Sequence, residues 1–176
     1  MTDFARSVGA IPAYAYLGDV GESPTGDKRA EKFEDDFIGE LFDELVRLGY
    51  KAVTYMPPRN TAEQLRRVRR LCAERNLMEI SGVDINSSRQ SFNCPEVARG
   101  EFRRLVDTTW ALIAHERLSS TDRRFGLFSP ENPLAEKTLE ARITVYAAAG
   151  RDLDLTHPED SGTEVLKKLL EGRYPS

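Results

Sequence analysis

The stretch that decides the fold class is Tyr50-Lys51-Ala52-Val53-Thr54-Tyr55-Met56-Pro57-Pro58-Arg59-Asn60-Thr61. Residues 51–56 predict a short β-strand, which stops at the two prolines because proline donates no backbone hydrogen bond. Asn60 has Glu63 three residues after it, and this capping-box spacing predicts that Asn60 begins a helix. The helix is expected to reach about Asn76, with an apolar stripe that faces the core.

Two more strands are predicted on either side of this stretch. Upstream, the nearly continuous apolar run 11–17 predicts a strand that is covered on both faces. A glycine-rich turn over residues 18–26 follows it. Downstream, residues 78–83 predict a third strand.

Between the first two strands, apolar residues recur every three or four positions, which predicts one helix that ends at Gly49. The apolar positions are Phe33, Phe37, Ile38, Leu41, Phe42, Leu45 and Leu48, and the acidic residues Glu34, Asp35, Glu40 and Asp43 are expected to face elsewhere. Alternating strands and helices predict an α/β fold class, with about three parallel strands and flanking helices.

The C-terminal part of the chain is predicted to be a helical extension. One long helix covers residues 102–113, a second begins near Asn132-Pro133 and ends before Gly150, and a third covers about residues 162–171. We therefore expect a β/α region over residues 1–120 and a helical extension over residues 121–176, packed on the same domain.

Composition limits the class of protein. The chain has 176 residues, enough for one domain with a sizeable core. Its 25 basic and 29 acidic residues give a net charge of 25 − 29 = −4, which argues against a protein that coats nucleic acid. No apolar run approaches the roughly 20 residues of a membrane span, and the N-terminus lacks the order of a signal peptide. We expect no nucleic-acid or membrane partner.

The chain has only two histidines and two cysteines. His115 and His157 are too few for a histidine-rich metal cluster, and His115 is expected to have a packing role, with metal ligation as the alternative. Cys72 and Cys94 form no zinc-binding or redox spacing, which favours a reducing cytoplasm. Cys72 falls on the inward stripe of its helix.

One helix is rich in arginine, at positions 66, 67, 69, 70 and 75. Because Glu63 and Glu74 are interleaved with them, a solvated outer face is favoured over a nucleic-acid surface. Pairing with the acidic residues of the preceding helix is a further possibility.

Polar residues follow each predicted strand, at the edge where parallel sheets carry their functional sites. They are Tyr16, Gly18 and Asp19 after the first strand, Arg59 and Asn60 after the second, and Asp84, Asn86, Ser87, Arg89 and Gln90 after the third. Asp19 and Asp84 could bind a hard divalent cation. Arg59 and Arg89, beside a helix N-terminus, suit a phosphate or carboxylate. As structural alternatives, Asp84 caps a turn and the arginines pair with neighbouring carboxylates.

Three segments together resemble the C-terminal half of a group of bacterial PHP-domain proteins, named after polymerase and histidinol phosphatase. The segments are residues 11–20, 50–61 and 80–92, and the resemblance covers roughly residues 10–120. It implies a distorted β/α barrel, similar to a TIM barrel, that binds a cluster of metal ions and hydrolyses phosphate esters. Manganese, magnesium or zinc is the cofactor that it implies.

The resemblance also shows where this chain departs from the family pattern. The N-terminal His-x-His motif of the family is absent, and Tyr16 stands where a histidine ligand is expected. The closing Asp-x-His motif corresponds to residues 84–86, so Asp84 is kept and Asn86 replaces the histidine. We therefore expect a partial, truncated domain with a depleted metal site.

Two function classes follow from this comparison. The first is a PHP-like phosphoesterase, a hydrolase in which Asp84 and Asn86 are catalytic, Asp84 and Asp19 bind metal, and Arg59, Asn60, Arg89 and Gln90 bind a small phosphorylated or anionic ligand. The ion would lower the pKa of the attacking water. The second is a non-catalytic anion-binding or assembly module from the same family.

Three parallel strands leave exposed sheet edges, which proteins rarely leave unpaired. We therefore expect a homodimer, or a complementing chain that supplies the missing strands. A third possibility is a helical partner that binds the face carrying Trp110 and Tyr146.

Overall fold

A computed structural model describes residues 2–18, 33–83, 85, 88 and 93–175. The α-helices are α1 (Thr2–Ser7), α2 (Phe33–Asp36), α3 (Ile38–Arg47), α4 (Ala62–Glu74), α5 (Arg103–Thr121), α6 (Leu139–Arg151) and α7 (Pro158–Leu170). The strands are β1 (Ala13–Ala15), β2 (Ala52–Tyr55) and β3 (Met78–Ser81), and short 3-10 turns lie at Pro95–Ala98, Gly100–Phe102 and Arg123–Phe125. No helix among these described residues combines the length and apolar character needed to cross a membrane.

The chain divides into two compact units. Residues 12–105 form one, which we call the sheet unit, and residues 3–11 together with 106–176 form the other, which we call the helical unit. The boundary between Leu105 and Val106 lies within α5. The expected division into domains at residue 120 stays a prediction.

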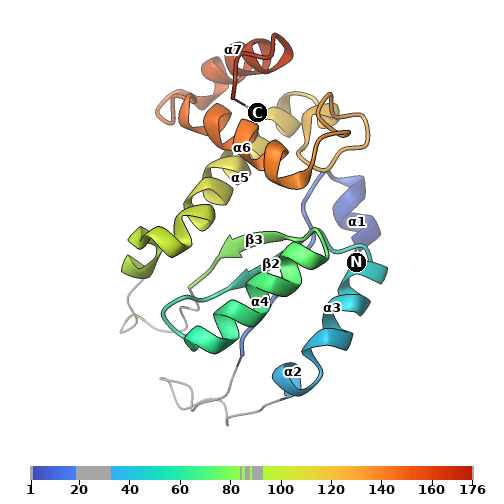
Figure 1. Ribbon diagram of the computed structural model, residues 1–176. Helices are drawn as coiled ribbons and strands as arrows, with labels where there is room; N and C mark the ends of the chain where they lie inside the picture. The colour runs from blue at the N-terminus through green and yellow to red at the C-terminus, as the bar shows by residue number, and fades with distance from the viewer. Residues whose placement is uncertain (1, 19–32, 84, 86–87, 89–92, 176) are drawn as a thin grey trace. The chain divides into compact units, whose positions relative to one another are not determined.

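The sheet unit contains an open, three-stranded parallel sheet in the order β1-β2-β3, which confirms the predicted α/β class. Figure 1 labels β2 and β3, with α4 in front of them. Ala13 of β1 pairs with Ala52 of β2, which pairs with Met78 of β3. All three strands therefore end at the same edge of the sheet, as expected. Because the strand order runs in one direction, right-handed crossovers keep α3 and α4 on one face.

That helix-covered face of the sheet holds the core. Its inward side chains belong to alternate strand residues and pack with α3 and α4 in one apolar cluster. The buried members are Tyr16, Ile38, Phe42, Leu45, Val53, Tyr55, Leu65, Val68, Leu71, Cys72, Leu77, Phe102 and Leu105. Cys72 is a buried free thiol, as the helical periodicity predicts, and Cys94 is a half-buried free thiol.

The opposite face of the sheet differs from its prediction. Ala13 and Ala15 of β1 are exposed, so the expectation that this strand is covered on both faces is wrong. The physical reason is that both crossover helices lie on the other face. On this face the exposure of the residues falls from β1 to the other two strands. Ala52 of β2 and Met78 of β3 are in register with Ala13 and are fully buried.

The predicted single helix over residues 33–48 is broken into α2 and α3 at Phe37, which has non-helical dihedral angles. Phe37 and Leu48 are exposed by 51% and 45%, so neither joins the core. Glu34 and Asp35, which were expected to face away, instead turn inward and bond to β1 and its end. Hydrogen bonds to the strand end thus override the apolar periodicity in the first turn.

The start of α4 is also one residue later than predicted. Thr61, and not Asn60, is the N-cap, and it forms a capping box with Gln64 in place of Glu63. Asn60 is buried, and its amide oxygen accepts a hydrogen bond of 2.9 Å from the backbone N–H of Met56. The side chain of Asn60 therefore closes the turn after β2.

The arginines of α4 do not form a purely solvated face. Arg67 pairs with Asp35 of α2, Arg69 lies 3.6 Å from Glu79 of β3, and Arg75 pairs at 2.8 Å with Asp43 of α3. Pairing between α4 and the acidic segment before it, raised above as a possibility, is thus confirmed for Arg67 and Arg75.

In the helical unit, the second helix was predicted too early. The segment after Asn132-Pro133 forms turns, and α6 begins only after its N-cap Thr138. The helix also continues through Gly150, where a Cβ atom would lie 2.1 Å from the carbonyl oxygen of Trp110 in α5. A side chain is impossible there without separating the two helices, so Gly150 sets their close approach.

His115 joins separate segments of the helical unit. Its Nδ1 accepts a hydrogen bond of 2.9 Å from the backbone N–H of Leu127, and the ring also bonds to the backbone of Gly9. His115 is only 8% exposed, so its predicted packing role is confirmed. Tyr146 is fully buried and donates to the carbonyl of Phe125, so it is not part of an exposed docking face.

Candidate functional site

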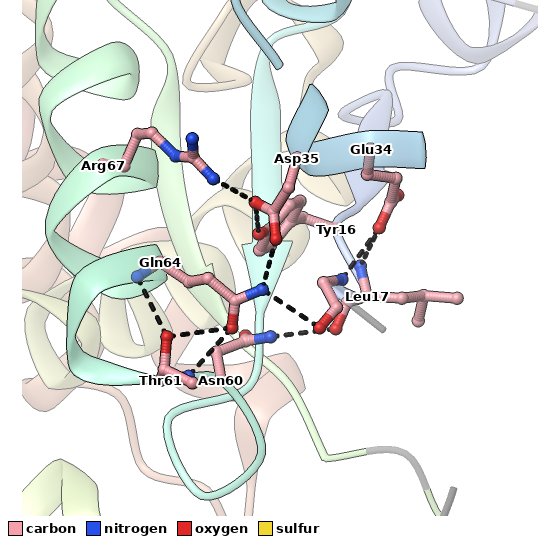
Figure 2. Close-up of polar contacts among 9 residues, drawn as sticks. Tyr16, Leu17, Glu34, Asp35, Asn60, Thr61, Gln64 and Arg67 are labelled. Carbon is pink, nitrogen blue, oxygen red and sulfur yellow. Dashed lines mark hydrogen bonds and ion pairs between the residues drawn. The ribbon is translucent and has the colours of Figure 1, made fainter. Parts of the chain in front are cut away.

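The most connected group of polar side chains lies where β1 and β2 end, at the edge of the sheet at which a site was predicted (Figure 2). We call it the strand-end network. Its members are the side chains of Tyr14, Tyr16, Glu34, Asp35, Asn60, Thr61, Gln64 and Arg67, together with the backbone of Gly18. They come from β1 and the residues after it, from α2, and from the first turns of α4.

Glu34 anchors α2 to the end of β1. One carboxylate oxygen accepts a hydrogen bond of 2.6 Å from the hydroxyl of Tyr14. The other accepts from the backbone N–H groups of Leu17 and Gly18, at 3.1 and 2.8 Å. Since an ionised carboxylate is purely an acceptor, it suits these three donors.

Asp35 connects three elements of the sheet unit. Its Oδ1 accepts from the hydroxyl of Tyr16 at 2.7 Å and from the guanidinium of Arg67, and its Oδ2 accepts from the amide of Gln64 at 2.6 Å. The side chain of Asp35 is only 11% exposed. Both of its oxygens are thus occupied by donors of this chain (Figure 2).

The surroundings of Asp35 favour its ionised form. Burial alone would raise the pKa of Asp35, but hydrogen bonds from Tyr16 and Gln64 and the charge of Arg67 together lower it below its usual value. Burial and the bond to Asp35 raise the pKa of Tyr16 well above its usual value. At neutral pH the pair is therefore a carboxylate that accepts from a neutral phenol.

Gly18 allows β1 and the turn after β2 to approach each other. It has a φ of +58°, a left-handed conformation that favours glycine. A Cβ atom there would lie 2.7 Å from Nδ2 of Asn60 and 2.8 Å from the ring of Tyr16. The amide of Asn60 donates to the carbonyl of Leu17 at 2.8 Å, and the amide of Gln64 donates to the carbonyl of Gly18 at 3.1 Å.

The chemistry of this arrangement is that of a closed hydrogen-bonded network. The two carboxylates accept from phenols, amides and a guanidinium, and burial together with these hydrogen bonds keeps both phenols neutral. A general base needs a free oxygen within reach of a substrate proton, and a metal ligand needs a free lone pair. Asp35 accepts three hydrogen bonds within the sheet unit, which leaves about one lone-pair site, on Oδ2, for a substrate proton or an ion.

A second buried carboxylate lies on β3. Glu79 is 7% exposed, and it accepts a hydrogen bond of 2.7 Å from the hydroxyl of Tyr55 in β2. Burial and the charge of Glu79 raise the pKa of Tyr55. The guanidinium of Arg69 lies 3.6 Å from the same carboxylate oxygen and stacks over Phe102. Glu79 thus holds two strands and α4 together.

Most of the residues that the sequence proposed for a site fall outside the described part of the chain. These are Asp19, Asp84, Asn86, Arg89 and Gln90. Arg59 is half-buried four residues after the end of β2, and the next residue, Asn60, is buried. The structure brings Asn60 to the strand ends as predicted, but its amide oxygen and one amide hydrogen are used on the backbone.

The metal site that the resemblance implies can be tested only in part. Within the described part of the chain, no three His, Cys, Asp or Glu side chains come together to hold an ion. The carboxylates that do lie at these strand ends, Glu34 and Asp35, each already accept three hydrogen bonds from donors of the chain. Ligation by Asp19 and Asp84 stays a prediction.

Sequence reasoning missed Glu34, Asp35 and Gln64 as members of this site. A signal existed in the spacing of Tyr14 and Tyr16, which puts two phenols on one face of a strand. Two buried phenols require partners, and the next acidic pair along the chain that could return to them was residues 34–35.

Comparisons of this chain with protein-family models, with curated proteins and with solved structures gave no match.

Proposed function

We propose that this chain is a non-catalytic assembly module of the PHP-like type that its sequence resembles. The observation that carries this proposal is the closed state of the strand-end network. Both oxygens of Asp35 accept from donors of the chain, and both oxygens of Glu34 do the same. Side chains that would serve a substrate or an ion in an enzyme here hold α2 and α4 to the sheet.

Tyr16 supports this proposal from the side of the resemblance. The family pattern has a histidine ligand at its position, and this chain has a phenol that donates to Asp35. A neutral phenol whose hydrogen bond is satisfied is a poor replacement for imidazole as a metal ligand. We propose that the substitution turned a ligand position into a structural one.

The fold also supports the proposal that the chain is related to the PHP-like type. We propose that the three strands are a segment of a distorted β/α barrel, because in a barrel all crossover helices lie on one face of the sheet, as α3 and α4 do here. We also propose the cytoplasm as the compartment, since Cys72 and Cys94 are both free thiols.

A metal-dependent phosphoesterase remains the second candidate. It is favoured by the sequence position of Asp84, three residues after the last residue of β3. In this proposal Asp84 and Asp19 would hold a divalent ion, and Arg59, Asn60, Arg89 and Gln90 would bind a phosphate ester.

Calorimetric titration with manganese, together with turnover of a phosphomonoester and a phosphodiester, separates the two candidates. We expect neither turnover nor manganese binding by the whole chain, and no change in Asp84→Ala. Turnover that disappears in Asp84→Ala and persists in Asp43→Ala, an exposed carboxylate on α3, would establish the phosphoesterase and overturn the assembly proposal.

A further inference from the structure

The outer edge of β1 presents backbone groups that no described residue bonds. The N–H of Tyr16 donates to Thr54, and the carbonyl of Pro12 accepts from Ala52, so even-numbered residues of this segment face β2. In a parallel ladder the odd-numbered residues must then direct their N–H and C=O groups away from β2. Within the described part of the chain, Ala13 and Ala15 therefore hold an edge of two donors and two acceptors that no other residue pairs.

This edge is also the exposed side of the sheet. Ala13 and Ala15 are exposed, whereas Met78 and Glu79 on the other edge strand are buried. Neither alanine carries a charge or bulk that would oppose another strand. Exposed edges of natural sheets are usually protected by a very short strand, or by lysine, proline or a bulge within it. With three residues β1 is short, but it contains no lysine, proline or bulge.

An apolar flank of α3 lies on the same side of the sheet unit. Asp43 of α3 pairs with Arg75 at the end of α4, so the flank that carries Asp43 faces α4. With about 3.6 residues per turn, Leu41 and Leu48 lie on the other flank, beyond the core residues. Leu48 is 45% exposed and Leu41 half-buried, and Phe37, directly before the helix, is 51% exposed.

We infer that the β1 edge and this flank of α3 form a docking surface for a second copy of the chain. The inference rests on the proposed assembly function and names its partner. The strands β1 of the two copies would pair antiparallel about a two-fold axis at Tyr14. Ala13 of each copy then faces Ala15 of the other, which gives four backbone hydrogen bonds between two donors and two acceptors of each strand.

The second copy is favoured because the surface complements itself. A two-fold axis places the same patch on both partners, so the residues of the patch must be able to pack against residues of an identical patch. β1 itself carries no charged side chain, and on α3 Glu44 forms an ion pair with Arg47. The Glu34 carboxylate lies past the end of β1, on the N–H groups of Leu17 and Gly18. Two apolar flanks of α3 would meet above the joined strands, where Leu48 and Phe37 lose contact with water.

The test is sedimentation of the whole chain from about 1 µM to about 1 mM, combined with amide hydrogen exchange. We expect a monomer–dimer equilibrium, with the amides of Ala13 and Ala15 exchanging more slowly as the dimer forms. A monomer over the whole range overturns the inference. So does a dimer in which these two amides exchange at the monomer's rate.

Two matched substitutions on α3 locate the interface. Leu48→Lys and Val46→Lys change residues that are both 45% exposed, on opposite flanks of the helix. We expect Leu48→Lys to raise the dissociation constant by about tenfold or more, and Val46→Lys to change it by less than about twofold. Equal effects of the two substitutions overturn the inference.

Ala15→Pro tests the strand itself. It removes the N–H of Ala15 and leaves the hydrogen bonds to β2 in place, because the backbone N–H and C=O groups of Ala15 point away from β2. We expect loss of dimer with an unchanged circular dichroism spectrum. If Ala15→Pro does not fold, the two lysine substitutions still decide. Turnover and manganese binding are measured separately, so failure of the dimer and failure of the non-catalytic proposal are distinguishable.

Discussion

The hydroxyl of Tyr16 lies 2.7 Å from Oδ1 of Asp35, and this bond joins the end of β1 to a helix 19 residues further along the chain. The same carboxylate accepts from Gln64 and Arg67 of α4. Three elements that are distant in sequence therefore depend on one ionised side chain.

Asp35 is expected to make the sheet unit sensitive to acid. Its pKa is lowered in the folded protein, so its contribution to stability is fully present above the unfolded-state pKa of about 4 and is lost as the pH falls below it. Asp35→Asn should be less stable at pH 7 and should lose less stability than the wild type between about pH 4 and pH 2. Urea unfolding at several pH values measures both.

Asp3→Asn is the control for that experiment, because Asp3 is an exposed carboxylate that pairs with Arg6, three residues away. It should follow the wild-type pH profile. A parallel loss of stability in Asp35→Asn and the wild type below pH 4 would contradict the role of Asp35.

Gly18→Ala is expected to destabilise the sheet unit by about 2 kcal/mol or more, because it combines a left-handed backbone with overpacking against Asn60 and Tyr16. Gly39→Ala is the matched control. Gly39 lies inside α3 with open space around its Cβ position, so alanine should stabilise the helix by about 0.5–1 kcal/mol. Denaturant midpoints measure the two changes, and a neutral Gly18→Ala would contradict the close approach.

Tyr55→Phe is expected to reduce the free energy of unfolding by about 1–3 kcal/mol. The reason is that Glu79 stays buried but no longer accepts the hydrogen bond from the hydroxyl of Tyr55. Replacing both partners in Tyr55→Phe/Glu79→Leu should be less harmful than the sum of the single changes. Urea unfolding of the four proteins gives the coupling between the two residues. Additive effects would show that the hydrogen bond contributes nothing.

His115 is expected to make the helical unit sensitive to mild acid. Burial lowers the pKa of His115, although the bond to Gly9 and the nearby Glu116 oppose this change. A lowered pKa means that the folded state holds a neutral ring, so stability declines as the pH falls below the unfolded value of about 6.5. Protonation would also turn Nδ1 from an acceptor into a donor, so it could no longer accept the hydrogen bond from the N–H of Leu127.

Trp110 is the single tryptophan and belongs to the helical unit, so its fluorescence reports on this change. The wild-type unfolding midpoint should fall between about pH 7 and pH 5, and that of His115→Phe should change less over this range. His157→Phe, an exposed histidine, serves as the control. A wild-type midpoint that does not vary with pH in this range would contradict the neutral, buried ring.

The sequence predicted the order of elements in the sheet unit because each strand and helix carries a local signal. Apolar runs bounded by Pro57 and Gly49, and the helical spacing of Leu65 and Val68, act within a few residues. The break at Phe37 had no such signal. It accompanies hydrogen bonds between residues 34–35 and the β1 segment, 19 and 20 positions earlier in the sequence. Helical periodicity cannot predict contacts between residues so far apart.

The candidate site was predicted in its place and only partly in its residues. Parallel strands must end at one edge, so Tyr16, Gly18 and Asn60 could be assigned to it from topology. Gln64 and Asp35 could not, because which helix turns inward depends on the pairing of buried polar groups. The N-cap differed by one residue for a related reason, since Thr61 and Asn60 both suit a cap and only the bond from Asn60 to Leu17 separates them.

The bonds from Glu34 to Leu17 and Gly18 have a consequence for how the chain can be re-engineered. They join Gly18 and Glu34, which are 16 positions apart in the sequence, with the N–H of Gly18 at 2.8 Å from the carboxylate. When the ends of a connection are fixed, doubling its length adds only about 0.6 kcal/mol of closure entropy. We therefore expect that lengthening the chain between Gly18 and Glu34, by an affinity tag or a reporter domain, costs little stability as long as these hydrogen bonds hold α2 to the end of β1.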